Sequence, residues 1–138
     1  MKYHILSIGI SKHQNSFVNT LQFADKDAVD FYTLFTSNIN DIGYKKLLIN
    51  SEATLAEIRT ALGKELRQAV GDEDAFFFFF SGHGATAENK DGTSLEHYLI
   101  PFDATSDIPS SAVSVDYLKE VFDKISCKAA YIFVDSCF

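Results

Sequence analysis

Short apolar runs alternate with amphipathic stretches along this chain, and the alternation predicts strands and helices in turn. Residues 3–10 contain three isoleucines and predict a strand, and apolar residues recur at helical spacing from Phe23 to Phe35. Residues 44–49 predict a second short strand. Thr54 followed by Glu57 is a capping-box signal for the start of the next helix. The apolar face of that helix comprises Leu55, Ile58, Leu62, Leu66 and Val70.

Five consecutive phenylalanines, Phe76 to Phe80, follow Ala75 without any polar alternation. A run of this kind is typical of a central strand in a parallel sheet that is covered by helices on both faces, so we expect both faces to be buried. The polar stretch 86–94 contains Asp91-Gly92 and predicts a hairpin or a mobile loop. Residues 97–100 predict a small strand.

The last third of the chain repeats the alternation. Ser114 is placed to cap a helix that continues to Ile125, and residues 129–134 predict a further main strand. Strands that alternate with helices indicate an open α/β sheet with right-handed crossovers. Because no repeat, low-complexity stretch or linker interrupts the pattern, we expect one domain over residues 1–138.

Composition narrows the class of protein. The chain has 138 residues, of which 46% are hydrophobic and 22% charged, and this balance excludes a disordered segment. No apolar run is long enough to span a membrane, and the N-terminus does not resemble a signal peptide. The formal charge of −7 disfavours binding to nucleic acid and suits a basic substrate. Two cysteines, Cys127 and Cys137, are too few for a disulfide scaffold, so we expect a reducing, cytoplasmic setting.

Reactive residues follow two of the predicted strands. Ser81-Gly82-His83-Gly84 comes directly after the phenylalanines, and Asp135-Ser136-Cys137 follows the last strand. Active sites of open α/β sheets gather at the carboxyl ends of the strands. If the two strands are neighbours, His83 can activate the Cys137 thiol as a nucleophile, and the N–H groups of Gly84 and Cys137 can bind an oxyanion. A lone histidine like His83, or a lone cysteine like Cys137, is more often a structural residue than a catalytic one. Cys127 follows no predicted strand and is interpreted as a packing residue.

The same residues resemble the catalytic motifs of a known family. Phe80-Ser81-Gly82-His83-Gly84 and Val134-Asp135-Ser136-Cys137 are similar to the two catalytic motifs of the caspase superfamily, and closest to those of its metacaspase and bacterial caspase-like branch. Weaker similarities follow the family's order along the chain. They are Ile8-Gly9-Ile10, the segment Leu21 to Ala28, which ends in Lys26-Asp27-Ala28, and the segment Leu99 to Asp103.

The resemblance implies a three-layer α/β/α fold with a mostly parallel central sheet, and a cysteine endopeptidase. His83 would be the general acid and base, and Cys137 the nucleophile. The chain would be the large-subunit portion of the catalytic domain, with the small-subunit part absent, so that its last strand is an exposed edge. A missing small-subunit half, or a regulatory domain or chain, is therefore an expected partner.

The resemblance also implies a preference for a basic residue before the cleaved bond. Asp27, Ser81 and Asp135 match residues that hold an arginine or lysine side chain in metacaspases, and two carboxylates suit a guanidinium. The arginine that holds aspartate in animal caspases has no equivalent, because no arginine precedes Arg59. The simpler interpretation of Asp27 is a solvated carboxylate in the first turn of a helix.

Some features depart from the family pattern and leave alternatives open. Phe23 and Lys26 replace the family's glycine and asparagine before Asp27, and Phe138 follows the nucleophile. No metal site is expected, and regulation by calcium stays open because Asp91 and Asp103 do not match a full ligand set. The alternatives to a protease are a catalytically silent scaffold and another Cys–His hydrolase or acyltransferase.

Overall fold

The main sheet of the protein has four parallel strands. A computed structural model describes all of residues 1–138. Strands β1 (Tyr3–Gly9), β2 (Ile42–Ile49), β3 (Ala75–Ser81) and β7 (Ala129–Asp135) are arranged in the order β2-β1-β3-β7. The strands that precede the two reactive motifs, β3 and β7, are therefore hydrogen-bonded neighbours, as the sequence argument required.

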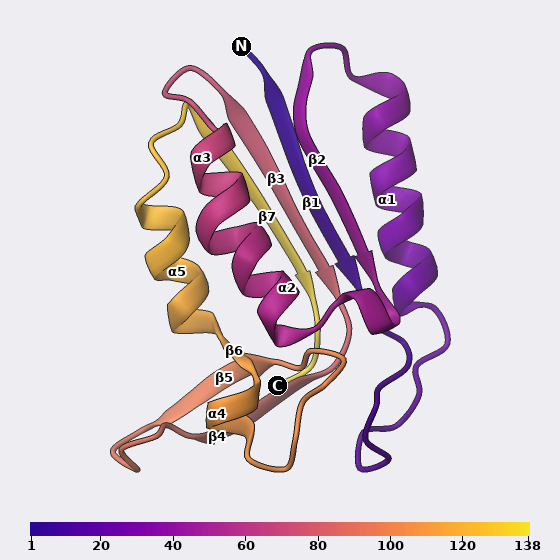
Figure 1. The fold of residues 1–138 in the computed structure, drawn as a ribbon, viewed down its shortest axis with the longest axis vertical. Helices are drawn as coiled ribbons and strands as arrows, with labels where there is room; N and C mark the ends of the chain where they lie inside the picture. Colours follow the sequence, from indigo (N-terminus) through magenta and orange to yellow (C-terminus); the bar gives the residue numbers. More distant parts are fainter.

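Helices cover both faces of this sheet and give the predicted three-layer α/β/α arrangement (Figure 1). One face carries α1 (Ala24–Asn38). The other face carries α5 (Val115–Asp123) and a continuous helical segment made of α2 (Leu55–Thr60), the π-helical stretch Ala61–Leu66 and α3 (Arg67–Ala69). None of these helices combines the length and the apolar character needed to cross a membrane.

A small antiparallel sheet lies beyond the carboxyl ends of the main strands (Figure 1). It contains β4 (Gly84–Glu88), β5 (Leu95–Leu99) and β6 (Val113–Ser114), and the short helix α4 (Ile108–Ser111) precedes β6. The polar stretch 86–94 thus belongs to a hairpin, as predicted, and Gly92 adopts a positive φ of 68° at its turn.

The phenylalanine run is buried more completely on one face than on the other. Phe76, Phe78 and Phe80 are fully buried in the main core, beneath the α2–α3 segment and α5. Phe77 and Phe79 face α1 and are only partly buried. The expectation of two buried faces is therefore correct for one face and only partly correct for the other, which has a single helix over it.

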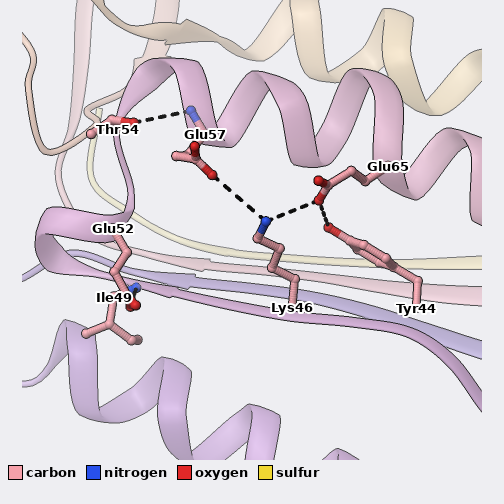
Figure 2. Close-up of polar contacts among 7 residues, drawn as sticks. All are labelled: Tyr44, Lys46, Ile49, Glu52, Thr54, Glu57 and Glu65. Carbon is pink, nitrogen blue, oxygen red and sulfur yellow. Dashed lines mark hydrogen bonds and ion pairs between the residues drawn. The ribbon is translucent and has the colours of Figure 1, made fainter.

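Polar contacts hold the α2–α3 segment over β2 (Figure 2). The Thr54 hydroxyl accepts the Glu57 N–H at 3.2 Å and caps α2 as predicted. The Glu57 carboxylate does not complete a capping box and instead lies 3.9 Å from the Lys46 ammonium. Lys46 also contacts Glu65 at 3.2 Å, and the Tyr44 hydroxyl donates to the same carboxylate at 2.7 Å. These contacts fix the position of the α2–α3 segment on β2.

Candidate active site

The two reactive motifs start from paired residues at the carboxyl edge of the sheet. Ser81, the last residue of β3, lies opposite Asp135, the last residue of β7, in the strand register. The Gly82 N–H donates to the Asp135 carbonyl at 3.3 Å, which extends the pairing one step beyond the strands. His83 and Cys137 follow two residues after these paired positions. His83 and Cys137 therefore both lie at the carboxyl edge of the sheet.

A single cleft of about 420 Å³ brings the predicted residues together. Asp27, Ser81, His83, Asp135 and Cys137 all line it. Ser81 is buried, whereas Asp27, Asp135 and Cys137 are exposed, so a ligand can reach both carboxylates and the thiol. The remaining lining comes from residues 21–24, Gly82 and Ser136, and includes no lysine or arginine.

The imidazole of His83 is oriented by a backbone carbonyl. Its Nε2 lies 2.7 Å from the carbonyl oxygen of Asn19, in the loop between β1 and α1. Because a carbonyl only accepts hydrogen bonds, Nε2 carries the proton and donates it. The neutral ring is then unprotonated at Nδ1, which is free to take a proton from a thiol or from water. Asn19 acts here through its backbone, which explains why the side-chain pattern of the sequence did not indicate it.

A second histidine packs beside this ring. The rings of His13 and His83 have their centroids 5.5 Å apart. Both ring nitrogens of His13 are shielded from solvent and make no well-formed hydrogen bond, although the Ile100 carbonyl faces the ring. Burial is the main cause that lowers the pKa of His13, and the charge of His83 lowers it further. No local pattern in the sequence indicates this contact, because the two histidines are 70 residues apart in the chain.

Gly84 lies where the two motifs touch. A Cβ at this position would be 2.5 Å from the Ser136 hydroxyl and 2.8 Å from the Phe138 ring. The Ile100 N–H donates to the His83 carbonyl at 3.0 Å, so Gly84 and Leu99 form a non-hydrogen-bonded pair in the antiparallel ladder. The Gly84 N–H is therefore not used by β5. The lack of a side chain and the unused donor are both compatible with the predicted oxyanion role.

Asp25 and Asp27, which both lie in the first turn of α1, have different surroundings. The Asp25 carboxylate accepts the Ser11 hydroxyl at 2.9 Å and the Asn50 amide at 3.0 Å. These hydrogen bonds, with that of Asn50 the strongest, lower the pKa of Asp25. Asn50 in turn accepts the Ser11 N–H at 2.8 Å, so the network ties the ends of β1 and β2 to the start of α1. Asp25 is thus structural and positions Asp27, which points to the cleft.

The remaining candidates lie outside this cleft. Cys127 packs against the main core as predicted, and burial raises the pKa of its thiol. Asp103 accepts the Leu55 N–H at 2.9 Å and so caps α2, while Asp91 lies at the turn of the β4–β5 hairpin. The structure contains no group of three or more histidine, cysteine or acidic side chains that are placed to hold a metal ion.

Comparison with known proteins agrees with this architecture. Residues 3–138 match the sequence model of the caspase domain, a peptidase family, and the chain belongs to that family. The crystal structure of protein GSU0716 from Geobacter sulfurreducens superimposes with a TM-score of 0.81 at 20% identity, over 99% of this chain and 51% of that one. At this level of identity the superposition shows a shared fold.

A curated relative is also similar to part of the chain. A probable protease of a Desulfuromonadales bacterium is 32% identical over 85 residues, which is 62% of this chain and 10% of that protein. The chain therefore spans about half of the similar solved structure and a tenth of the length of this relative.

Proposed function

We propose that this chain is the large-subunit portion of a cysteine endopeptidase that cleaves after arginine or lysine. The observation that carries the proposal is the common cleft, which is lined by one thiol, one oriented imidazole and two exposed carboxylates. Membership of the caspase domain family supports peptidase chemistry, and so does the similarity to a probable protease. The acidic lining supports a basic substrate.

The proposed reaction assigns one step to each group. His83 takes the proton of Cys137, and the thiolate attacks the carbonyl carbon of the scissile bond. The N–H groups of Gly84 and Cys137 hold the oxyanion; the Cys137 N–H makes no hydrogen bond within the chain. The C–N bond then breaks, and the leaving amine takes the proton from His83. Water, deprotonated by His83, hydrolyses the thioester and returns the thiol. The cycle calls for no cofactor.

The charges around the cleft favour a basic side chain of the substrate. Asp27 and Asp135 line the cleft from α1 and β7, and Ser81, which is paired with Asp135 in the strand register, lines it as well. The two arginines lie elsewhere: Arg59 is on α2 with its guanidinium over the Tyr117 ring, and Arg67 is on α3. No guanidinium of this chain is therefore placed to hold a substrate aspartate.

The outer strand β7 supports the proposed small-subunit partner. Its residues 131–134 remain 39–46% exposed although they are aromatic or aliphatic. An apolar cavity of about 250 Å³ adjoins Phe133 on the α1 face, and another of about 310 Å³ adjoins Ile132 and Val134 on the α5 face. We propose that a further segment or chain pairs with this edge and covers both cavities.

We further propose that the protein acts in the cytoplasm, as a regulated protease in bacterial stress, defence or cell-death signalling.

The test is cleavage of fluorogenic peptides with arginine, lysine, aspartate or alanine before the scissile bond. Full-length protein and its Cys137→Ala variant are assayed side by side, with and without calcium. We expect arginine and lysine peptides to be cleaved, and the variant to lose this activity. Cleavage after aspartate would overturn the specificity and keep the protease. If no peptide is cleaved, the protein is either a dormant zymogen or a silent scaffold. Failure of a basic-residue chloromethyl ketone to alkylate Cys137 then favours the scaffold.

A further inference from the structure

A second cavity adjoins His83 outside the proposed catalytic cleft. It encloses about 250 Å³ between the loop that follows β1, the start of β4 and the start of α4. Its walls are formed by Phe17, Val18, Ala85, Ile100 and Ile108, and Asn19, His83 and Gly84 complete the lining. His83 is the one residue that this cavity shares with the cleft.

The second cavity is apolar and well supported. Apart from His83, its lining contains no residue that carries a charge. A small buried cluster that includes Tyr98 and Ile100 lies behind the cavity, and Val18, Ala85 and Ile108 pack against it. This packing holds these lining residues in place. Phe17 is 50% exposed at the rim. The cavity therefore presents apolar surface to a ligand beside a ring that the proposed mechanism uses.

The proposed reaction defines what must lie next to His83. Cys137 attacks the carbonyl carbon, and His83 gives a proton to the nitrogen on the other side of the same bond. The residue that contributes this nitrogen must therefore leave past His83, while the basic residue before the bond occupies the acidic cleft. Resting on that proposed function, we infer that the second cavity binds the side chain of the residue after the scissile bond and selects an aliphatic or aromatic one.

The chemistry of the walls gives the expected preference. A single additional methylene group in an apolar pocket changes kcat/KM by about 10- to 200-fold, so leucine should be preferred over glycine by about tenfold or more. An aspartate or lysine side chain would lose hydration in this cavity without gaining a partner, and it should be disfavoured.

The first experiment measures kcat/KM for internally quenched peptides that have arginine before the bond and leucine, phenylalanine, glycine, aspartate or lysine after it. Phe17→Ser and Ile108→Ser should lower the leucine-to-glycine ratio toward one. Leu95→Ser is the matched control, since Leu95 is 69% exposed on β5 and lines neither cavity. Because Phe17 is half exposed, its replacement should leave folding intact, which a thermal melt checks. Equal rates for leucine and glycine would overturn the inference.

The second experiment separates the subsite from the chemistry. Binding of the same peptides to Cys137→Ala is measured by fluorescence anisotropy. If nothing is cleaved by the parent protein but the leucine peptide still binds about tenfold more tightly than the glycine peptide, the subsite stands and the peptidase proposal fails. If cleavage occurs and both peptides bind equally, the peptidase proposal stands and the subsite is refuted.

Discussion

The rings of His13 and His83 lie side by side, with their centroids 5.5 Å apart, so the histidine proposed to be catalytic shares its surroundings with a second titratable ring. The two rings reach this position from the loop after β1 and from the end of β3. A positive charge on His83 opposes protonation of His13.

Replacing His13 should make the protein less sensitive to acid. Its pKa in the folded state is below the ordinary value of 6.5, mainly through burial. The unfolded chain therefore takes up the proton first, and stability is lost as the pH falls below about 6.5. His13→Phe keeps a ring and removes this proton. We expect the melting temperature of the variant, relative to the parent, to be higher at pH 5 than at pH 7.5. A difference in melting temperature between variant and parent that is the same at both pH values would contradict this prediction.

Gly84→Ala should damage the site more than the fold. The new methyl group would meet Ser136 and the Phe138 ring at 2.5–2.8 Å, and the segment that carries Cys137 must shift to admit it. A displacement of about 1 Å at reacting groups costs on the order of 100-fold in rate. The measurement is kcat/KM on an arginine peptide, with a thermal melt beside it.

Gly63→Ala provides the matched control for this substitution. Gly63 lies within the helical segment, and a Cβ there approaches only the Tyr117 hydroxyl, at 3.0 Å. Alanine also favours a helix over glycine. Activity in this variant should stay within about twofold of the parent, since the contact is far from the chemistry. Equal losses in the two variants would mean that Gly84 has no special role.

Asp27→Asn should weaken recognition of a basic residue. A hydrogen bond to a charged group contributes about 1.5–3 kcal/mol, so kcat/KM for an arginine peptide should fall by about 10- to 100-fold, mainly through a higher KM. Asp30→Asn is the control on the same helix, because Asp30 pairs with Lys26 at 2.7 Å on the exposed surface. An exposed ion pair of this kind contributes little to the stability of the protein. If both variants lose activity equally, the effect is one of general charge and not of the cleft.

An acid-sensitive contact is also present at the opposite end of the sheet. His4 is buried; its Nδ1 accepts the Tyr44 N–H at 2.9 Å, and its Nε2 donates to Asp74 at 2.9 Å. This hydrogen bond from His4, followed by those from the N–H groups of Lys2 and Gly71, lowers the pKa of Asp74 well below its ordinary value of 3.8.

Asp74→Asn tests this contact by its pH dependence. A lowered carboxyl pKa contributes stability above about pH 4, and this contribution is lost as the pH falls through the folded-state value. The variant should therefore melt at a lower temperature than the parent at pH 7. The gap between the two should narrow as the pH is lowered from 4 toward 2. Melting curves across this range check the prediction, and a gap that widens with acid would refute it.

The sequence predicted the layout of the site because its reactive residues follow strongly apolar strands. The phenylalanine run predicted an interior strand, and residues beyond the ends of interior parallel strands lie together at one edge of the sheet. Ser81 and Asp135 are opposite each other for that reason. Their roles in catalysis and specificity remain predictions that the assays above address.

Other features could not be predicted, for physical reasons. The partner of His83 is a backbone carbonyl, and any residue at position 19 has one. The contact of His13 with His83 depends on how the loop after β1 folds back, which no local pattern indicates. The strand β4 carries only small residues, Ala85 and Ala87, on its packed side, and these give a weak strand signal.

The π-helical stretch Ala61–Leu66 determines which side chains of the α2–α3 segment face the sheet. Apolar residues of this segment recur every four positions, at Ile58, Leu62 and Leu66, and all three are buried. An α-helix has 3.6 residues per turn, so a strict four-residue repeat would drift around it by about 40° at each step. A π-helical turn contains more residues than an α-helical turn, so it offsets this drift and keeps the three side chains facing the sheet. Deletion of one residue here would rotate one half of the helix out of phase with the other, so the length of this segment is as constrained as its composition.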